Sequence, residues 1–175
     1  MDITLQPMLD KLLDAYSHQY DIAREVTEED TLWPATATYY LRDENYLISK
    51  EHVLSAVEQH EYVYFYLTDH LTAADLQARV DLSKRAGLRK VRPHKDHMFS
   101  NITLVILANT IAPEARKILK KTRFRKNYKL SLHGWTEFQL AAMEVSTNCF
   151  LSNPAGRGAK QILEQNFSFK NKGKL

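Results

Sequence analysis

A lysine, a serine and an imidazole alternate along residues 129–133. If Tyr128 begins a β-strand, Lys129, Ser131 and His133 lie on the same face of it, because strand side chains alternate between faces. Lys129 would neutralise an anion, His133 would move protons near neutral pH, and Ser131 would donate a hydrogen bond or act as nucleophile. Trp135 would lie beside them. These three residues are our candidate catalytic site, for a small hydrolase, although no third group orients His133 and a solvated strand face is the alternative.

A second concentration of reactive side chains is His94, Asp96 and His97. Two imidazoles and a carboxylate within four residues can begin a metal site. Zinc sites usually take two ligands from each of two segments, and the sequence has no second pair at such spacing. We therefore expect no metal and no cofactor, and we interpret residues 89–97 as an exposed basic loop.

The cations gather in two clusters. The first is Lys84, Arg85, Arg89, Lys90, Arg92 and Lys95; the second is Arg116, Lys117, Lys120, Lys121, Arg123, Arg125 and Lys126. Phe124 and Tyr128, which are interleaved with the second cluster, would add stacking. If both clusters share a face, that face suits phosphate backbones, although no helix-turn-helix, RNP or zinc-finger signature is present.

The charge is divided unequally along the chain. Residues 1–69 carry four Lys or Arg against 14 Asp or Glu, and residues 70–175 carry 20 against seven. Either the two parts neutralise each other, within one fold or between two copies, or the basic part binds an anionic partner. Our first hypothesis is a non-enzymatic binding protein with a basic face for nucleic acid or phosphate. Its candidate ligand-binding residues are Lys129, His133, Trp135, Arg123 and Arg125.

A metal-dependent nuclease is part of the alternative hypothesis. Its chemistry needs an acid followed by Asp/Glu-x-Lys on the adjacent strand, to hold Mg²⁺ and activate water. The available acids and lysines are Glu44, Asp69, Glu144, Lys50 and Lys129, and none of them has that spacing. The sequence leaves open whether the protein is an enzyme, and it favours the non-enzymatic hypothesis.

Hydrophobic periodicity and turn residues place these groups on an α+β framework. Helices are expected at 5–23, 51–59, 73–86 and 113–121 and around Ile162; strands are expected at 35–41, 46–49, 62–67, 102–108, 128–132, 138–145 and 149–151. Thr72 and Asp75 predict a helix N-terminus, and Gly87 predicts a helix end. The continuous apolar run 102–108 predicts a central strand. The result is a mixed sheet of about six to seven strands, with two hairpins and a parallel crossover, flanked by helices.

Length and composition favour one domain. The chain has 175 residues, 44% of them hydrophobic and 26% charged, which is ordinary for a globular protein. We expect a domain at 1–167 followed by a basic flexible tail at 168–175. A single cysteine, Cys149, and the absence of a signal peptide or a long apolar run favour the cytoplasm, without membrane attachment.

The segments 99–108, 128–135 and 138–151 resemble a family of small, uncharacterised bacterial and archaeal proteins that has no assigned activity. The resemblance covers the C-terminal half of the chain. It implies no function and assigns no catalytic residue.

Overall fold

The computed structural model describes residues 5–43 and 57–168. Its elements are α1 (Leu5–Ser17), β1 (Asp21–Glu28), β2 (Thr31–Asp43), β3 (Val57–Leu71), α2 (Ala73–Lys90), β4 (His97–Ile111), α3 (Pro113–Lys121), β5 (Arg125–Asn127), β6 (Trp135–Glu144), β7 (Cys149–Ser152) and α4 (Arg157–Phe167). The predicted strand 46–49, most of the predicted helix 51–59, and the tail beyond Ser168 lie outside the described residues.

The seven strands form one mixed sheet in the order β1-β2-β3-β4-β6-β5, with β7 also paired to β6. β4 lies between β3 and β6 and is parallel to both, while all other pairs are antiparallel. The apolar run 102–108 is buried throughout because both faces of β4 are covered along this stretch. The α+β class, the central strand and the hairpin of β6 and β7 are thus confirmed.

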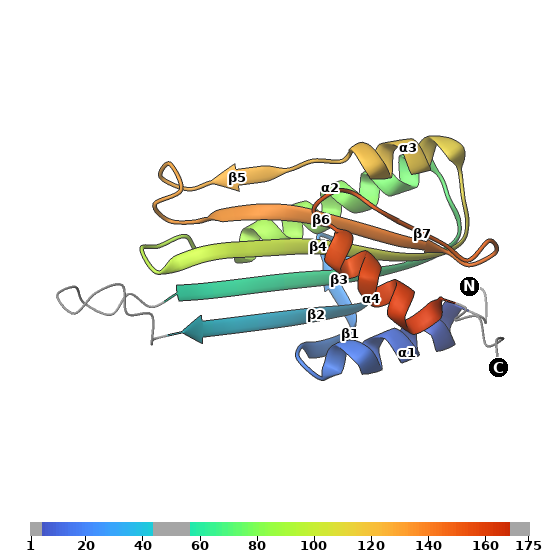
Figure 1. Ribbon diagram of the computed structural model, residues 1–175, viewed down its shortest axis with the longest axis horizontal. Helices are drawn as coiled ribbons and strands as arrows, with labels where there is room; N and C mark the ends of the chain where they lie inside the picture. Colours follow the sequence, from blue (N-terminus) through green and yellow to red (C-terminus); the bar gives the residue numbers. More distant parts are fainter. Residues whose placement is uncertain (1–4, 44–56, 169–175) are drawn as a thin grey trace, which may run out of the picture.

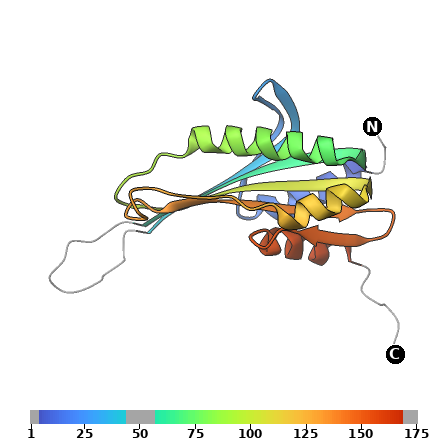
Figure 2. The ribbon, with the colours of Figure 1, turned by 90° about the horizontal axis from the view of Figure 1, so that it is seen from above.

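Helices cover the two faces of the sheet differently (Figures 1 and 2). α2 and α3 pack on one face, over a core that includes Tyr64, Leu104 and Phe138. α1 and α4 pack on the opposite face, over a core that includes Phe65 and Val105. In both views α1 and α4 lie over only one half of their face, and none of the described helices lies over the half near the start of β4 and β6. We call this uncovered area the open half; it is formed by Tyr39, Leu41, Gln59, Glu61, Phe99, Asn101, Arg125, Trp135 and Glu137, which alternate with residues of the opposite core.

The predicted helix at 73–86 is present, and it is longer than expected. The Asp75 amide donates to Thr72 Oγ1 at 3.1 Å, which confirms the N-cap. The helix does not end at Gly87 but runs to Lys90. A Cβ at Gly87 would lie 2.6–2.8 Å from three carbons of Ile102, so the glycine permits close packing of α2 on β4 rather than a helix end.

The N-terminal predictions needed correction. The helix expected at 5–23 ends at Ser17, and strand β1 occupies residues 21–28, where no strand was expected. Edge strands expose many side chains, so their polar composition reads like a loop. The turn lies at Glu29 and Asp30, each with φ of 53°, as in the two-residue turns that join antiparallel strands. β2 therefore forms a hairpin with β1, and it extends beyond the expected strand 35–41 as far as Asp43.

The strand expected at 128–132 is also wrong. Lys129, Leu130 and Ser131 have φ of 46°, 53° and 71°, and the His133 amide donates back to the Tyr128 carbonyl oxygen. The segment is a turn between β5 and β6, and its leucines, Leu130 and Leu132, are 95% and 78% exposed. The strand that follows β4 in the chain and pairs parallel with it is β6. None of the described helices is long and apolar enough to cross a membrane.

Candidate functional site

The turn at 128–134 separates the three candidate catalytic side chains instead of aligning them. Lys129 and Ser131 are exposed on it. His133 contributes its backbone carbonyl oxygen, which accepts a hydrogen bond from His97 Nδ1 at 2.7 Å. Partial desolvation, and then the nearby charges of Lys129, His94 and His97, lower the pKa of His133. Among the described residues nothing forms a hydrogen bond with the His133 imidazole or the Ser131 hydroxyl, so the geometry contains no nucleophile and base pair here.

A cluster of histidines lies below this turn, at the end of the sheet. Buried Glu58 accepts hydrogen bonds from His94 Nε2 at 2.7 Å and from Arg42 at 2.9 Å, and His60 Nε2 lies 3.7 Å from the same carboxylate. Next to them, buried His97 accepts a hydrogen bond from the Ser100 hydroxyl at 2.8 Å, because its Nδ1 donates to the His133 carbonyl. Ser100 is fully buried, so this pair holds the start of β4 against the turn.

Burial and charge act in opposite directions within this cluster. Burial alone would raise the pKa of Glu58, but the hydrogen bond from His94 and the charges of His94, Arg42 and His60 lower it. Burial lowers the pKa of His60, and the charge of Glu58 only partly compensates. Glu58 is therefore ionised and His60 is neutral near pH 7.

The possible metal ligands do not converge. His94 is bonded to Glu58 and His97 to Ser100, while the Asp96 amide donates to His94 Nδ1. Over residues 5–43 and 57–168, no group of three or more His, Cys, Asp or Glu side chains is placed to hold a metal ion.

The acids of the nuclease alternative are engaged in structure where they are described. Glu144 is buried and bonds to Arg116, to the Thr147 hydroxyl and to the Ile111 amide, which fixes the start of α3. Asp69 accepts a hydrogen bond from Asn109 at 2.8 Å. Glu44 and Lys50 lie outside the described residues.

The first basic cluster is largely neutralised by the acidic part of the chain. Arg89 and Arg85 lie 2.9 and 3.5 Å from the Glu29 carboxylate, and Lys90 lies 2.7 Å from Glu28. These carboxylates belong to the β1–β2 turn, which reaches the C-terminal end of α2. The charge asymmetry of the sequence is thus partly an internal complement.

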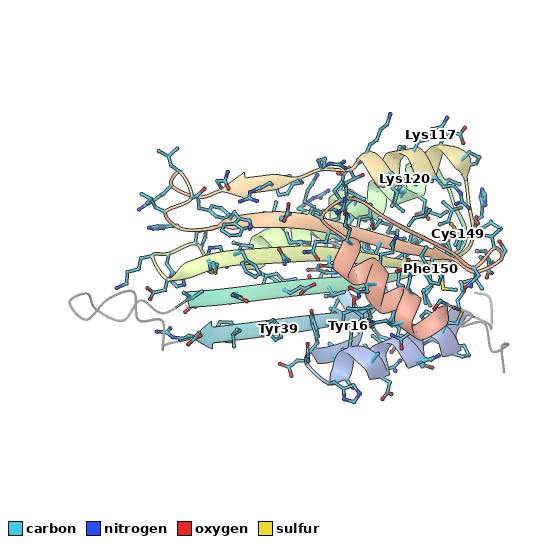
Figure 3. All side chains as sticks on the ribbon, in the orientation of Figure 1. Tyr16, Tyr39, Lys117, Lys120, Cys149 and Phe150 are labelled. Atoms are coloured by element: carbon cyan, nitrogen blue, oxygen red, sulfur yellow. The ribbon has the colours of Figure 1, made fainter. Side chains whose placement is uncertain are left out.

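The second cluster is different. Apart from Arg116, its members are exposed, and no ion pair joins them to a carboxylate in the described part of the chain. We call this group the basic edge: Lys117, Lys120, Lys121, Arg123, Arg125 and Lys126. It follows α3 and the short outer strand β5 along one border of the sheet, and Figure 3 shows Lys117 and Lys120 on α3.

The basic edge meets an aromatic group on the open half. Phe99 and Trp135 are cross-strand neighbours whose rings stack with centroids 5.7 Å apart and an interplanar angle of 29°. The guanidinium carbon of Arg125 lies 4.7 Å from the centroid of the Trp135 ring. We call these three residues the Phe99–Trp135–Arg125 stack. Both rings are half-buried, so part of each faces the open half.

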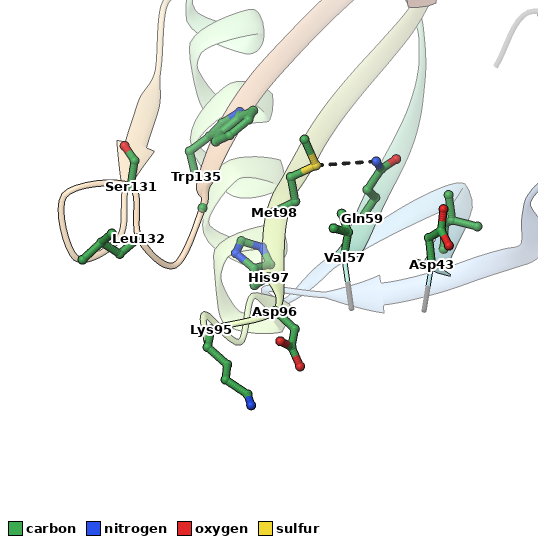
Figure 4. A pocket seen from close by; sticks show the side chains of 12 residues that line it. Asp43, Val57, Gln59, Lys95, Asp96, His97, Met98, Ser131, Leu132 and Trp135 are labelled. Carbon is green, nitrogen blue, oxygen red and sulfur yellow. Dashed lines mark hydrogen bonds between the residues drawn. The ribbon is translucent and has the colours of Figure 1, made fainter. Parts of the chain in front are cut away.

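Two hollows flank the stack. One, of about 390 Å³, is bordered by Trp135 and Leu132 on one side and by Val57 and Gln59 on the other, with His97 and Met98 between them (Figure 4). The other, of about 190 Å³, is lined by Arg123, Arg125, Phe138 and Pro154 among others. One hollow is thus mainly apolar, and the other contains two guanidinium groups and the carboxylate of Glu137.

The structure brings together some of the sequence candidates and separates others. Arg123, Arg125 and Trp135 lie around one site, and Lys129 and Ser131 lie on the adjacent turn. Phe99 was missed because only the register of β4 with β6 places it beside Trp135. Glu58 and His60 were missed as site residues. Glu58 had been assigned to a helix, although residues 57–59 belong to β3.

Comparison with known proteins adds a family and no activity. Neither the curated proteins nor the solved structures contain a match to this chain. The sequence does match the domain of unknown function DUF8052 over residues 4–165, which takes in both halves of the chain and not only the C-terminal segments. This match spans most of the chain, and the protein therefore belongs to the DUF8052 family, for which no function is assigned.

Proposed function

We propose that this protein binds nucleic acid through its basic edge and is not an enzyme. The observation that supports the proposal is the contrast between the two basic clusters. Four members of the first cluster lie beside carboxylates, namely Lys84, Arg85, Arg89 and Lys90. The six exposed cations of the basic edge have no such partner among the described residues.

The geometry of the edge suits an extended polyanion. Lys117, Lys120 and Lys121 share one side of α3, because they are three and four residues apart on a helix. Arg123, Arg125 and Lys126 continue the row along the chain into β5. Unpaired cations on a surface attract counterions, and a polyanion gains free energy by releasing its own counterions when it replaces them.

The strength of this attraction sets a scale for the test. If all six cations contact phosphates, the slope of log K against log salt concentration is about −5 for a duplex and about −4 for a single strand. Each contact contributes roughly fivefold to affinity at ~0.15 M salt.

The experiment is a salt titration of binding to generic DNA and RNA oligonucleotides, followed by fluorescence anisotropy. The variant Lys117→Gln/Lys120→Gln/Lys121→Gln removes three cations that make no described contact with a carboxylate. We expect about a 100-fold loss of affinity at ~0.15 M salt and a slope smaller in magnitude by about 2 to 3.

The matched control is Arg85→Gln/Arg89→Gln/Lys90→Gln, which makes the same change in net charge on the paired cluster. We expect it to bind nearly as the wild type does. The proposal is overturned if the wild type shows no affinity at low salt, or if the two triple variants weaken binding equally.

A further inference from the structure

We infer that the nucleic acid is single-stranded and that its bases stack on the Phe99–Trp135–Arg125 stack while its phosphates follow the basic edge. This inference rests on the proposed function and specifies its ligand. It is carried by the position of Arg125, which belongs to both groups. Arg125 is one of the six cations that form no ion pair with a described carboxylate, and its guanidinium group also covers the Trp135 ring.

The stack is already built as a base-binding platform. Phe99 and Trp135 fix each other's side-chain conformation through cross-strand packing. Binding a base therefore does not require either ring to lose conformational freedom. Arg125 covers Trp135 with a planar cation, and a nucleobase can stack on that guanidinium plane or take its place on the indole. Such contacts are tolerant of sequence, because every base has a π-face.

The two hollows differ in which part of a nucleotide they suit. The hollow lined by Arg123, Arg125 and Glu137 carries a net positive charge, and neither guanidinium group forms an ion pair with a carboxylate in the described chain, so this hollow suits a phosphate. The hollow lined by Trp135, Met98 and Leu132 offers apolar surface to a base. Since Arg125 and Trp135 are in contact, phosphate and base sites are adjacent.

Carboxylates set the inner limit of the phosphate path. Glu137 is in register with Arg125 on the open half. Farther in, Glu61 is held by the Tyr20 hydroxyl at 2.7 Å and by Thr103 Oγ1 at 2.9 Å. Glu61, which has no neighbouring cation in the described chain, repels phosphates, and both carboxylates can accept hydrogen bonds from base N–H groups, so the bases point inward and the backbone stays at the edge.

This arrangement disfavours a duplex. A duplex hides its base faces from Trp135, and its second backbone would approach the carboxylates of the open half. A single strand presents one backbone and unstacked bases, which matches the division between the basic edge and the stack.

The experiment compares a 20-nucleotide oligo(dT) with a duplex of the same length, using tryptophan emission and anisotropy. The chain has two tryptophans, and Trp33 is fully buried. In a Trp33→Phe background the emission therefore reports Trp135 alone. We expect oligo(dT) to quench this emission and the duplex to leave it unchanged.

Two substitutions then test the stack directly. Each of the variants Trp135→Leu and Phe99→Leu should weaken oligo(dT) binding by about 5- to 150-fold. The affinity for the duplex should not change, and neither should the slope of log K against log salt concentration, because the phosphate contacts remain. The matched control is Tyr40→Leu, an exposed aromatic on the opposite face of the sheet, and it should have no effect. In the Trp135→Leu variant, the emission of buried Trp33 shows whether the core remains folded.

The outcomes separate the two proposals. Binding of oligo(dT) and duplex with equal affinity, or oligo(dT) binding that is indifferent to Trp135→Leu, overturns the inference and leaves the basic edge as a nucleic-acid site. About 100-fold weaker binding in the α3 triple variant, together with quenching of Trp135 emission by oligo(dT) in the Trp33→Phe background, supports both. No binding of either probe at low salt overturns both.

Discussion

The contact between Gly87 and Ile102 gives a quantitative test of how α2 packs on the sheet. In Gly87→Ala the new Cβ would lie 2.6, 2.7 and 2.8 Å from Cγ1, Cδ1 and Cγ2 of Ile102, which is fully buried on β4. Replacing glycine with alanine inside a helix gains about 1 kcal/mol, while overpacking costs about 1–3 kcal/mol. We expect Gly87→Ala to lower the free energy of unfolding by up to about 2 kcal/mol.

A second substitution, at Ile102, removes the atoms that clash with the new Cβ at position 87. Ile102→Ala deletes all three clashing atoms and should cost about 2–5 kcal/mol on its own, because it leaves a cavity. In the double variant the alanine at 87 partly fills that cavity. The double variant should therefore be no less stable than Ile102→Ala alone, with a coupling energy of about 1–3 kcal/mol.

Urea denaturation followed by far-UV circular dichroism measures all four free energies of the cycle, provided the m-value stays constant. The reasoning is refuted if the two effects add within about 0.5 kcal/mol, or if Gly87→Ala alone stabilises the protein by the full helix-propensity gain.

Three further predictions concern the site and its support. Gly134→Ala would place a Cβ 2.1 Å from the Met98 carbonyl oxygen at a φ of +74°, so it should lower the free energy of unfolding by at least about 2 kcal/mol, measured as a fall in Tm. Asn153→Ala removes the side-chain oxygen that accepts a hydrogen bond from the buried Leu140 amide at 2.9 Å. The free energy of unfolding, measured by urea denaturation, should fall by roughly 2 kcal/mol. An unchanged value would show that water replaces the Asn153 oxygen. Burial lowers the pKa of His60 below its usual 6.5, so the unfolded chain binds a proton that the folded chain does not. Stability should thus fall as the pH drops below about 6.5. In His60→Gln the urea midpoint should depend less on pH in that range, and a variant with the same pH dependence as the wild type would contradict this explanation.

Sequence reasoning worked where one local signal dominated. The run 102–108 is continuously apolar, so a central strand was the simplest interpretation, and Thr72 with Asp75 fixed the start of α2. It failed where the secondary structure of a segment depends on the strand that it pairs with in the fold. β1 is polar because it is an edge strand, and its identity depends on pairing with β2.

The turn at 128–134 shows a second limit. The alternation of Lys129, Ser131 and His133 was real in the sequence, but three consecutive residues without glycine adopt positive φ, which composition does not indicate. The cations of the basic edge could be identified from the sequence, whereas the lack of a carboxylate partner for them within residues 5–43 and 57–168 could not. That distinction depends on where the β1–β2 turn reaches α2.

The layer formed by α1 and α4 has a consequence for the order of folding. Lys11 Nζ donates to the Asn166 carbonyl oxygen at 2.6 Å and lies 5.3 Å from the Phe167 ring, a contact that spans 155 residues. In contrast, α2 packs on β3 and β4, the strands that flank it along the chain, and α3 packs on α2 and β7. During synthesis the α2/α3 layer can assemble on β3, β4 and β6 as soon as they emerge. α1 can pack on β1, β3 and β4 as these strands emerge, but its contact with α4 forms only at the end, so part of its apolar side stays exposed until then and adds to the risk of aggregation.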